Sequence, residues 1–133
     1  MIGATPGGLK INFHLSGGTV SGPGIQGKVR PAGGDWLTVR GDGIGLVDAR
    51  VCFETHDNAL LMLSYDGVID FGADGYEKFL RDGPPPVAQI RVAARCSSGR
   101  SSYQWLNRVL CFGIGEYRKA ERTAAYDIYA LTG

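Results

Sequence analysis

The feature that most constrains this chain is glycine, which recurs between short apolar runs along the whole length. The chain has 21 glycines in 133 residues, spread as single residues and pairs instead of one tract. Regularly spaced turn residues between short apolar runs are typical of many short strands joined by turns. The length suits one domain, and no linker or repeat divides residues 1–133.

Alternation of apolar and polar residues predicts where the strands lie. Residues 9–15 alternate strictly, as a half-buried strand does. Further strands are predicted at 19–20, 25–29, 35–40, 45–55, 59–65, 88–96, 103–115 and 124–131, with loops at 31–34 and 97–102. Residues 74–82 carry the one helical pattern, with Asp74 as its N-cap. We expect an all-β domain of about eight or nine antiparallel strands and one short helix.

A sheet of this size is expected to close on itself. A flat sheet would expose two edges that invite aggregation, whereas a single antiparallel β-barrel has none. A barrel of about eight strands can hold one small ligand. Residues 60–63 and 109–112 are apolar on both faces, so their outer faces need a cover, and we expect a homo-oligomer.

Charge and composition exclude several kinds of partner. The net charge is +1, with 14 basic and 13 acidic residues and no basic run, so no nucleic-acid partner is expected. No apolar run reaches the ~18 residues of a membrane helix, and the start of the chain has no signal-peptide pattern. We therefore expect no membrane partner and a cytoplasmic location.

Cysteine and histidine give no sign of a metal or cofactor. Cys52, Cys96 and Cys111 form no C-x-x-C pair, and buried reduced thiols are the favoured interpretation over a nucleophile, which would lack a neighbouring histidine in sequence. His14 and His56 lack the spacing of a metal motif. No metal and no cofactor are expected.

Two strands carry the charged residues that could line a ligand site. On residues 45–55, Val47 and its apolar neighbours face one way, and Asp48 and Arg50 face the other way with Cys52. The apolar face is expected inside; the alternative puts Asp48 and Arg50 in the lumen as a hydrogen-bonded pair, which burial of Cys52 would support. Arg91 likewise lies on an exposed face or points inward to hold an anionic group.

Several segments together resemble the family called domain of unknown function 3237, whose members form small lipocalin-like (calycin-like) β-barrels. They are Thr5–Gly8, Gly17–Pro23, Gly33–Trp36, Asp42–Gly43, Leu46–Arg50, Tyr103–Arg108 and Tyr126–Tyr129. The resemblance covers almost the whole chain, and the Trp-Leu-Asn run at 105–107 is its most specific piece. It implies a barrel with a pocket shared by Asp35, Asp48, Arg50, Arg91, Trp105 and Asn107. Members usually carry one more strand before Thr5–Gly8, and an edge left open there would suit a second subunit.

These residues lead to a hypothesis about function. The chain is expected to bind an aromatic or oxygenated organic acid, with Arg50 or Arg91 holding the anion and Trp36 and other aromatic residues lining the pocket. A cofactor-free lyase, isomerase or cyclase step would use Asp35 or Asp48 as base, with Tyr65 and Asn107 donating to an oxyanion. The alternatives are a carrier or sensor with the same pocket, and a structural subunit with a filled barrel.

Overall fold

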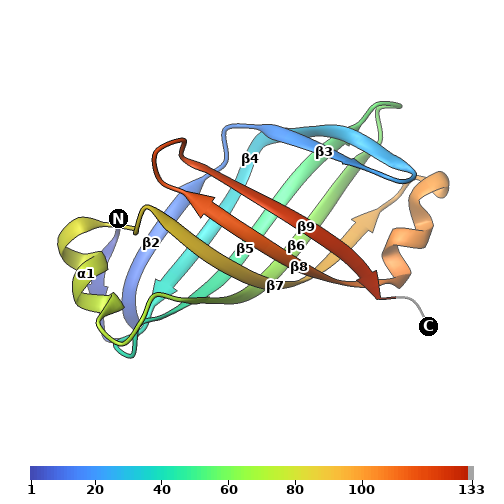
Figure 1. The fold of residues 1–133 in the computed structure, drawn as a ribbon. Helices are drawn as coiled ribbons and strands as arrows, with labels where there is room; N and C mark the ends of the chain where they lie inside the picture. Colours follow the sequence, from blue (N-terminus) through green and yellow to red (C-terminus); the bar gives the residue numbers. More distant parts are fainter. Residues whose placement is uncertain (132–133) are drawn as a thin grey trace.

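The computed structural model describes residues 1–131 and contains nine antiparallel strands, one short α-helix and one 3-10 helix (Figure 1). The strands are β1 (Gly3–Thr5), β2 (Gly8–His14), β3 (Gly18–Gly22), β4 (Ile25–Val39), β5 (Ile44–Thr55), β6 (Leu60–Asp70), β7 (Val87–Ser98), β8 (Leu110–Arg118) and β9 (Thr123–Leu131). The helices are α1 (Gly75–Asp82) and η1 (Ser101–Arg108). The all-β class and the short helix are as expected from the sequence.

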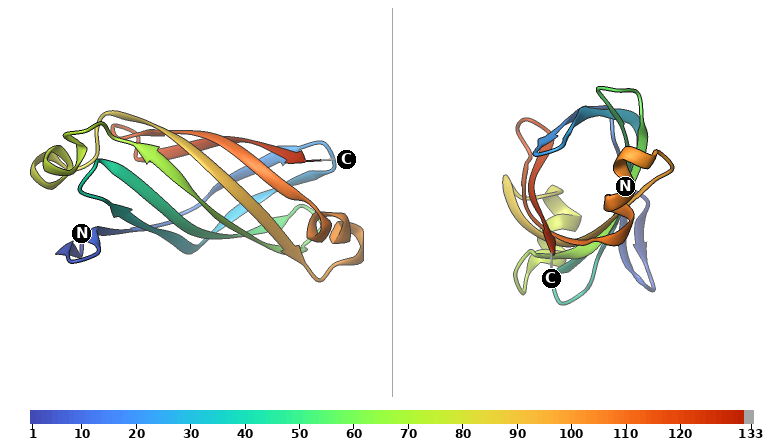
Figure 2. Two further views of the ribbon diagram at one scale, coloured as in Figure 1. Left: turned by 90° about the horizontal axis from the view of Figure 1, so that it is seen from below. Right: turned by 90° about the vertical axis from the view of Figure 1, so that its right-hand side faces the viewer.

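The strands form one curled sheet that strand pairing does not close. Its order is β1-β2-β4-β5-β6-β7-β8-β9, and β3 pairs with β4 beside this path. Seen end-on, the strands surround a common interior (Figure 2). Within the described residues β9 pairs only with β8. The sequence predicts a fully closed barrel, whereas the structure has a barrel-like sheet with an unpaired seam.

Period-two alternation decides which side chains face inward. In β5, Val47, Ala49, Val51 and Phe53 are buried. In β7, Ala88, Ile90, Val92 and Ala94 are buried in the same way. All of them except Ala94 belong to two apolar clusters along the interior. The favoured interpretation of residues 45–55 is therefore correct. The alternative, with Asp48 and Arg50 inside, is wrong because inverting β5 would put four apolar side chains in water.

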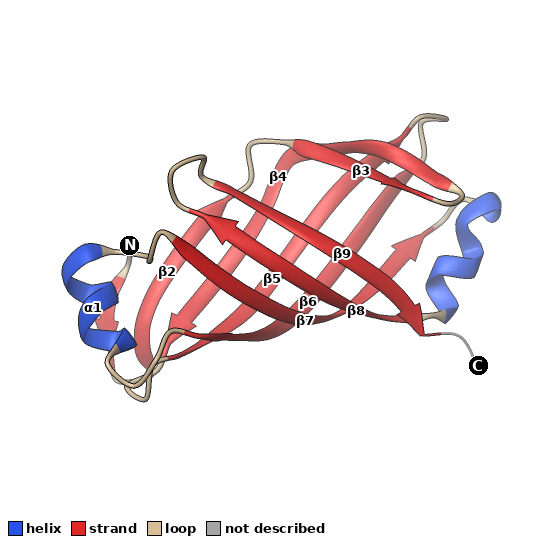
Figure 3. Ribbon diagram, viewed as in Figure 1, coloured by secondary structure: helices blue, strands red, loops and turns tan. Residues whose placement is uncertain are grey.

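A helix lies at each end of the curled sheet (Figure 3). Phe79 of α1 is buried and packs edge-on against Phe71, with ring centroids 5.4 Å apart. At the other end Tyr103 and Leu106 of η1 are buried, and the Tyr103 hydroxyl donates to Asp57 at 2.8 Å. Neither helix of the described residues is long and apolar enough to cross a membrane.

Three local expectations are corrected by the structure. Residues 103–108 belong to η1 instead of a strand, because Tyr103 and Leu106 at i and i+3 face the core from one side of a 3-10 turn. The expected loop at 31–34 is part of β4, which continues through a register irregularity between Val29 and Gly33. Asp74 occupies the N-cap of α1 but makes no side-chain capping bond, since its carboxylate pairs with Lys78 at 2.9 Å.

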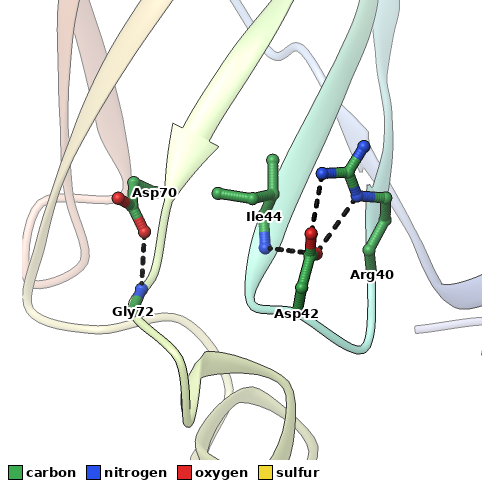
Figure 4. A network of polar contacts seen from close by, with 5 residues as sticks. All are labelled: Arg40, Asp42, Ile44, Asp70 and Gly72. Atoms are coloured by element: carbon green, nitrogen blue, oxygen red, sulfur yellow. Dashed lines mark hydrogen bonds and ion pairs between the residues drawn. The ribbon is translucent and has the colours of Figure 1, made fainter.

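The turn between β4 and β5 requires glycine at one position, next to the polar contacts of Arg40, Asp42 and Ile44 that Figure 4 draws. Asp42 accepts from the Arg40 guanidinium and from the Ile44 backbone N–H at 3.2 Å. Gly43 has a φ of +87°, and its carbonyl accepts from the Phe71 N–H at 2.9 Å. A Cβ on Gly43 would lie 1.6 Å from the Gly72 carbonyl oxygen. Only glycine permits this contact between the turn and the segment leading into α1.

Replacing Gly43 with alanine is expected to lower the free energy of unfolding by about 2 kcal/mol or more, because positive φ and the backbone clash add. Gly41→Ala in the same turn is the control, since nothing lies within 4 Å of its Cβ position; it should change stability by less than about 0.5 kcal/mol. Urea unfolding of both variants makes the comparison. Equal stabilities would contradict the proposed close contact.

Candidate functional site

The curled sheet brings one carboxylate into its interior. Asp35 is in phase with the buried Leu37 and Val39 on β4, so its side chain lies on the inner face. It is paired in register with Ala49, which is followed by Tyr65 on β6. Asp35, Ala49 and Tyr65 thus lie in one cross-strand row, and the small Ala49 side chain separates the acid from the tyrosine.

Tyr126 on β9 reaches the same place from the far edge of the sheet. Its ring packs edge-on against Tyr65, with centroids 5.5 Å apart, although β6 and β9 are not neighbours in the sheet. A Cβ on Gly115 would lie 2.4 Å from the Tyr126 ring, so the glycine provides the room in which this ring crosses β8. The interior therefore joins Asp35, Tyr65 and Tyr126, which we call the Asp-Tyr-Tyr cluster.

Burial changes the acid–base properties of this cluster. Loss of hydration raises the pKa of Asp35 from 3.8 to about 6. The Asp48 backbone N–H donates to Asp35 Oδ1 at 3.2 Å and opposes that rise, while the Asp48 charge adds to it. Burial also raises the pKa of Tyr65 and of Tyr126, and the charge of Asp35 contributes to both. At neutral pH the cluster thus holds one carboxylate and two protonated hydroxyl groups.

Water can reach the cluster, because all three side chains are only partly buried. Two more aromatic rings border the interior nearby. Phe13 of β2 and Tyr117 of β8 have centroids 6.3 Å apart, tilted by 51°. Asp35 is the one acidic side chain on the inner faces of strands β2 and β4 to β9 within residues 1–131, and no lysine, arginine or histidine lies on those faces. Around Asp35 the described interior therefore carries aromatic rings and hydroxyl groups beside a single carboxylic acid.

The other residues expected in the pocket lie elsewhere. Asp48 and Arg50 are exposed on the outer face of β5 and form a loose ion pair at 3.9 Å. Arg91 is exposed on the outer face of β7, where its guanidinium donates to the Ile90 carbonyl at 3.0 Å. Trp36 is 44% exposed on the outer face of β4. The expectation that these charged residues share the interior with Asp35 is wrong, because strand alternation places them opposite the apolar core.

The Trp-Leu-Asn segment of η1 has a structural role at the end of β7. The Asn107 side chain accepts from the Ser98 N–H and donates to the Ser98 carbonyl, both at 2.8 Å. These two bonds satisfy the backbone N–H and carbonyl of Ser98 at the end of β7, as bonds to a neighbouring strand would. Trp105 is 46% exposed on the same helix. Neither side chain joins the Asp-Tyr-Tyr cluster.

The three cysteines are free, and burial makes two of them poorly suited to act as nucleophiles. Cys111 is buried, and Cys52 and Cys96 are half-buried. Burial raises the pKa of Cys96 to about 11 and also raises that of Cys111, which keeps both as neutral thiols. No group of three or more histidine, cysteine or acidic side chains that could hold a metal ion occurs in the described part of the chain.

Comparison with known proteins assigns the family. The family model described as protein of unknown function (DUF3237) matches residues 1–131. The chain belongs to this family. A UPF0311 protein of Rhodopseudomonas palustris is 32% identical over 117 residues, which cover 86% of this chain and 76% of that relative. The resemblance drawn from the sequence is confirmed.

Solved structures agree with the fold. A conserved protein of unknown function from Rhodopseudomonas palustris superposes with a TM-score of 0.83 at 26% identity, covering 98% of this chain and 86% of its own. A β-barrel-like protein from Acinetobacter baumannii gives a TM-score of 0.79 at 23% identity, covering 98% and 83%. These similarities support a barrel-like fold and carry no activity with them.

Asparagine in place of Asp35 should stabilise the protein at neutral pH. The folded-state pKa lies above that of the unfolded chain, so the folded protein binds more protons between about pH 4 and pH 6, and its stability falls as pH rises through that window. The neutral amide avoids this loss and can still accept from the Asp48 N–H. At pH ~7.5 we expect the free energy of unfolding of Asp35→Asn to exceed that of the wild type by about 2 kcal/mol, and the difference should vanish near pH ~4.

Urea unfolding across this pH range measures the effect. Asp127→Asn, an exposed change on the outer face of β9, is the control and should match the wild type within about 0.5 kcal/mol. A variant at Asp35 that is less stable than the wild type at pH ~7.5 would show that the carboxylate is not destabilised by burial.

Proposed function

We propose that the interior binds a small, neutral, oxygen-bearing organic molecule and that Asp35 moves a proton on it. The observation that carries the proposal is an interior carboxylate whose pKa is raised to about 6 beside Tyr65 and Tyr126. A general base with a pKa near the working pH is well suited to proton abstraction.

The lack of an inner cation favours a neutral ligand over an organic acid. Strands β2 and β4 to β9 of residues 1–131 direct no lysine, arginine or histidine inward. An anionic ligand would enter a partly dehydrated space that already holds the Asp35 charge, and an unpaired charge in such a space is costly. A carbonyl or phenolic compound brings no such charge and can accept from the tyrosine hydroxyl groups.

The chemistry assigned to the cluster is enolisation. The Asp35 carboxylate takes a proton from a carbon next to a carbonyl, and the electron pair of that C–H bond moves to form the enolate. The hydroxyl groups of Tyr65 and Tyr126 donate to the enolate oxygen, as groups in an oxyanion site do. Return of the proton to another carbon gives an isomerase, and loss of a group from the β-carbon gives a lyase. No cofactor is needed for either outcome.

The test uses 4-hydroxyacetophenone, a neutral aromatic ketone with exchangeable methyl protons. In D2O the protein should speed the loss of the methyl proton NMR signal, with a rate that rises through pH ~6 as Asp35 ionises. Asp35→Asn should abolish the acceleration, and Tyr126→Phe should reduce it by about tenfold or more. Asp127→Asn should exchange like the wild type. The anion 4-hydroxybenzoate should bind at least about tenfold more weakly than the ketone.

The outcomes separate the proposed enzyme from its alternatives. Ketone binding at interior residues with no exchange would overturn catalysis and leave a carrier or sensor. No shift of any interior backbone amide by either compound would overturn ligand binding in the lumen and favour a structural subunit. Chemical-shift mapping of the folded protein reads out both.

A further inference from the structure

The outer face of β5 to β9 carries large apolar side chains that the described chain leaves uncovered. The register places Val68, Ile114, Phe112 and Tyr129 on adjoining rows of this face. Each is about half exposed, from 48% for Val68 to 59% for Tyr129. Monomeric proteins rarely leave large contiguous apolar patches in water.

A hollow of about 790 Å³ opens on the same face. Its lining includes the small residues Gly67 and Ala93. Asp48, Asp66, Arg91 and Phe112 also border it. A Cβ on Gly67 would lie 2.0 Å from the Arg91 carbonyl oxygen, so the close approach of β6 and β7 requires the glycine. The small side chains leave Phe112 as a prominent ring at the edge of a depression.

The charges around the hollow are unbalanced within one chain. Asp48 and Asp66 are directly opposite each other across β5 and β6, and like charges in that position are destabilising. Among the described residues, no ion pair forms at Asp66 or Arg91. Arg91 lies one strand over from Asp66 and one row along. An acidic side and a basic side therefore lie next to each other on one apolar face.

We propose that this face is the contact between two copies of the chain, related by a twofold axis that sets Arg91 of each copy against Asp66 of the other. A symmetric contact uses the same surface patch twice, so the patch must be complementary to itself. A face that carries both an unpaired acid and an unpaired arginine meets that condition, whereas a partner of one charge sign would leave one of them unmatched. Phe112 borders the same hollow as Arg91 and Asp66, so its ring lies within this contact.

Apolar burial and charge have different parts in this contact. Stable interfaces bury about 800 Å² on each partner, and the apolar rows supply the area. The two symmetry-related Arg91–Asp66 pairs set the register between copies, since charges contribute more to specificity than to affinity. The partner's guanidinium also relieves the repulsion between Asp48 and Asp66.

Charge exchange tests the contact in the full chain. Analytical ultracentrifugation of the wild type at micromolar concentration should give about twice the 14.2 kDa chain mass. Asp66→Arg and Arg91→Asp should each shift the protein to monomer, and the double variant should return it to dimer. Phe112→Ser should raise the dissociation constant at least about tenfold. Glu77→Arg on α1 makes the same charge change away from this face and should remain dimeric.

Circular dichroism verifies that every variant is folded, which the exposure of all four positions favours. A wild type that stays monomeric throughout the range overturns the proposal and indicates a different occupant for the face. A dimer that survives both single reversals and Phe112→Ser overturns it as well, because the contact must then lie elsewhere. The recovery of the dimer in the double variant is the result that a merely structural effect of either residue would not produce.

Discussion

The interior of this sheet is held together by aromatic side chains that meet across it from strands far apart in the pairing order. In the part of the chain that the structure describes, strand pairing stops at β9, so hydrogen bonds alone would allow the sheet to open at its seam. The contacts of Phe13 with Tyr117 and of Tyr65 with Tyr126 span that interior. Such pairs add about 0.5–1.5 kcal/mol beyond the area they bury. Because rings and not backbone close the space, the interior is lined by hydroxyl groups as well as by apolar surface.

The position of Asp35 follows from the same arrangement and has an energetic cost. A carboxylate among aromatic rings loses hydration, and the single bond from the Asp48 N–H does not restore it. A domain built only for stability would place a neutral residue here, since Leu37 and Val39 show what the same face of β4 otherwise carries. Ionisable groups whose pKa is shifted by burial are common at functional sites. Gly115 supports the same interpretation, because a side chain at this position of β8 would occupy the space of the Tyr126 ring.

Much of this could be read from the sequence, and what could not depends on curvature. Alternation alone correctly put Val47 to Phe53 inside, and the same rule applied to Ile90 and Val92 would have put Arg91 outside. Asp35 could be recognised as inner-facing from its phase with Leu37 and Val39. The contact of Tyr65 with Tyr126 could not, because β6 and β9 are not paired and their side chains meet only when the whole sheet curls. The 3-10 turn at 103–108 was also hidden, since an i, i+3 apolar pattern in a short run is compatible with a strand.

Strand alternation also explains how one thin sheet can present two unrelated surfaces. On β6, Tyr65 faces the interior while its neighbours Ser64 and Asp66 face outward. On β7, Ile90 and Val92 complete the interior wall while Arg91 between them borders the outer hollow. A change to an outer side chain therefore leaves the inner row in place as long as the backbone register is kept. The proposed ligand chemistry inside and the proposed association outside therefore depend on different side chains and share only the backbone of the sheet.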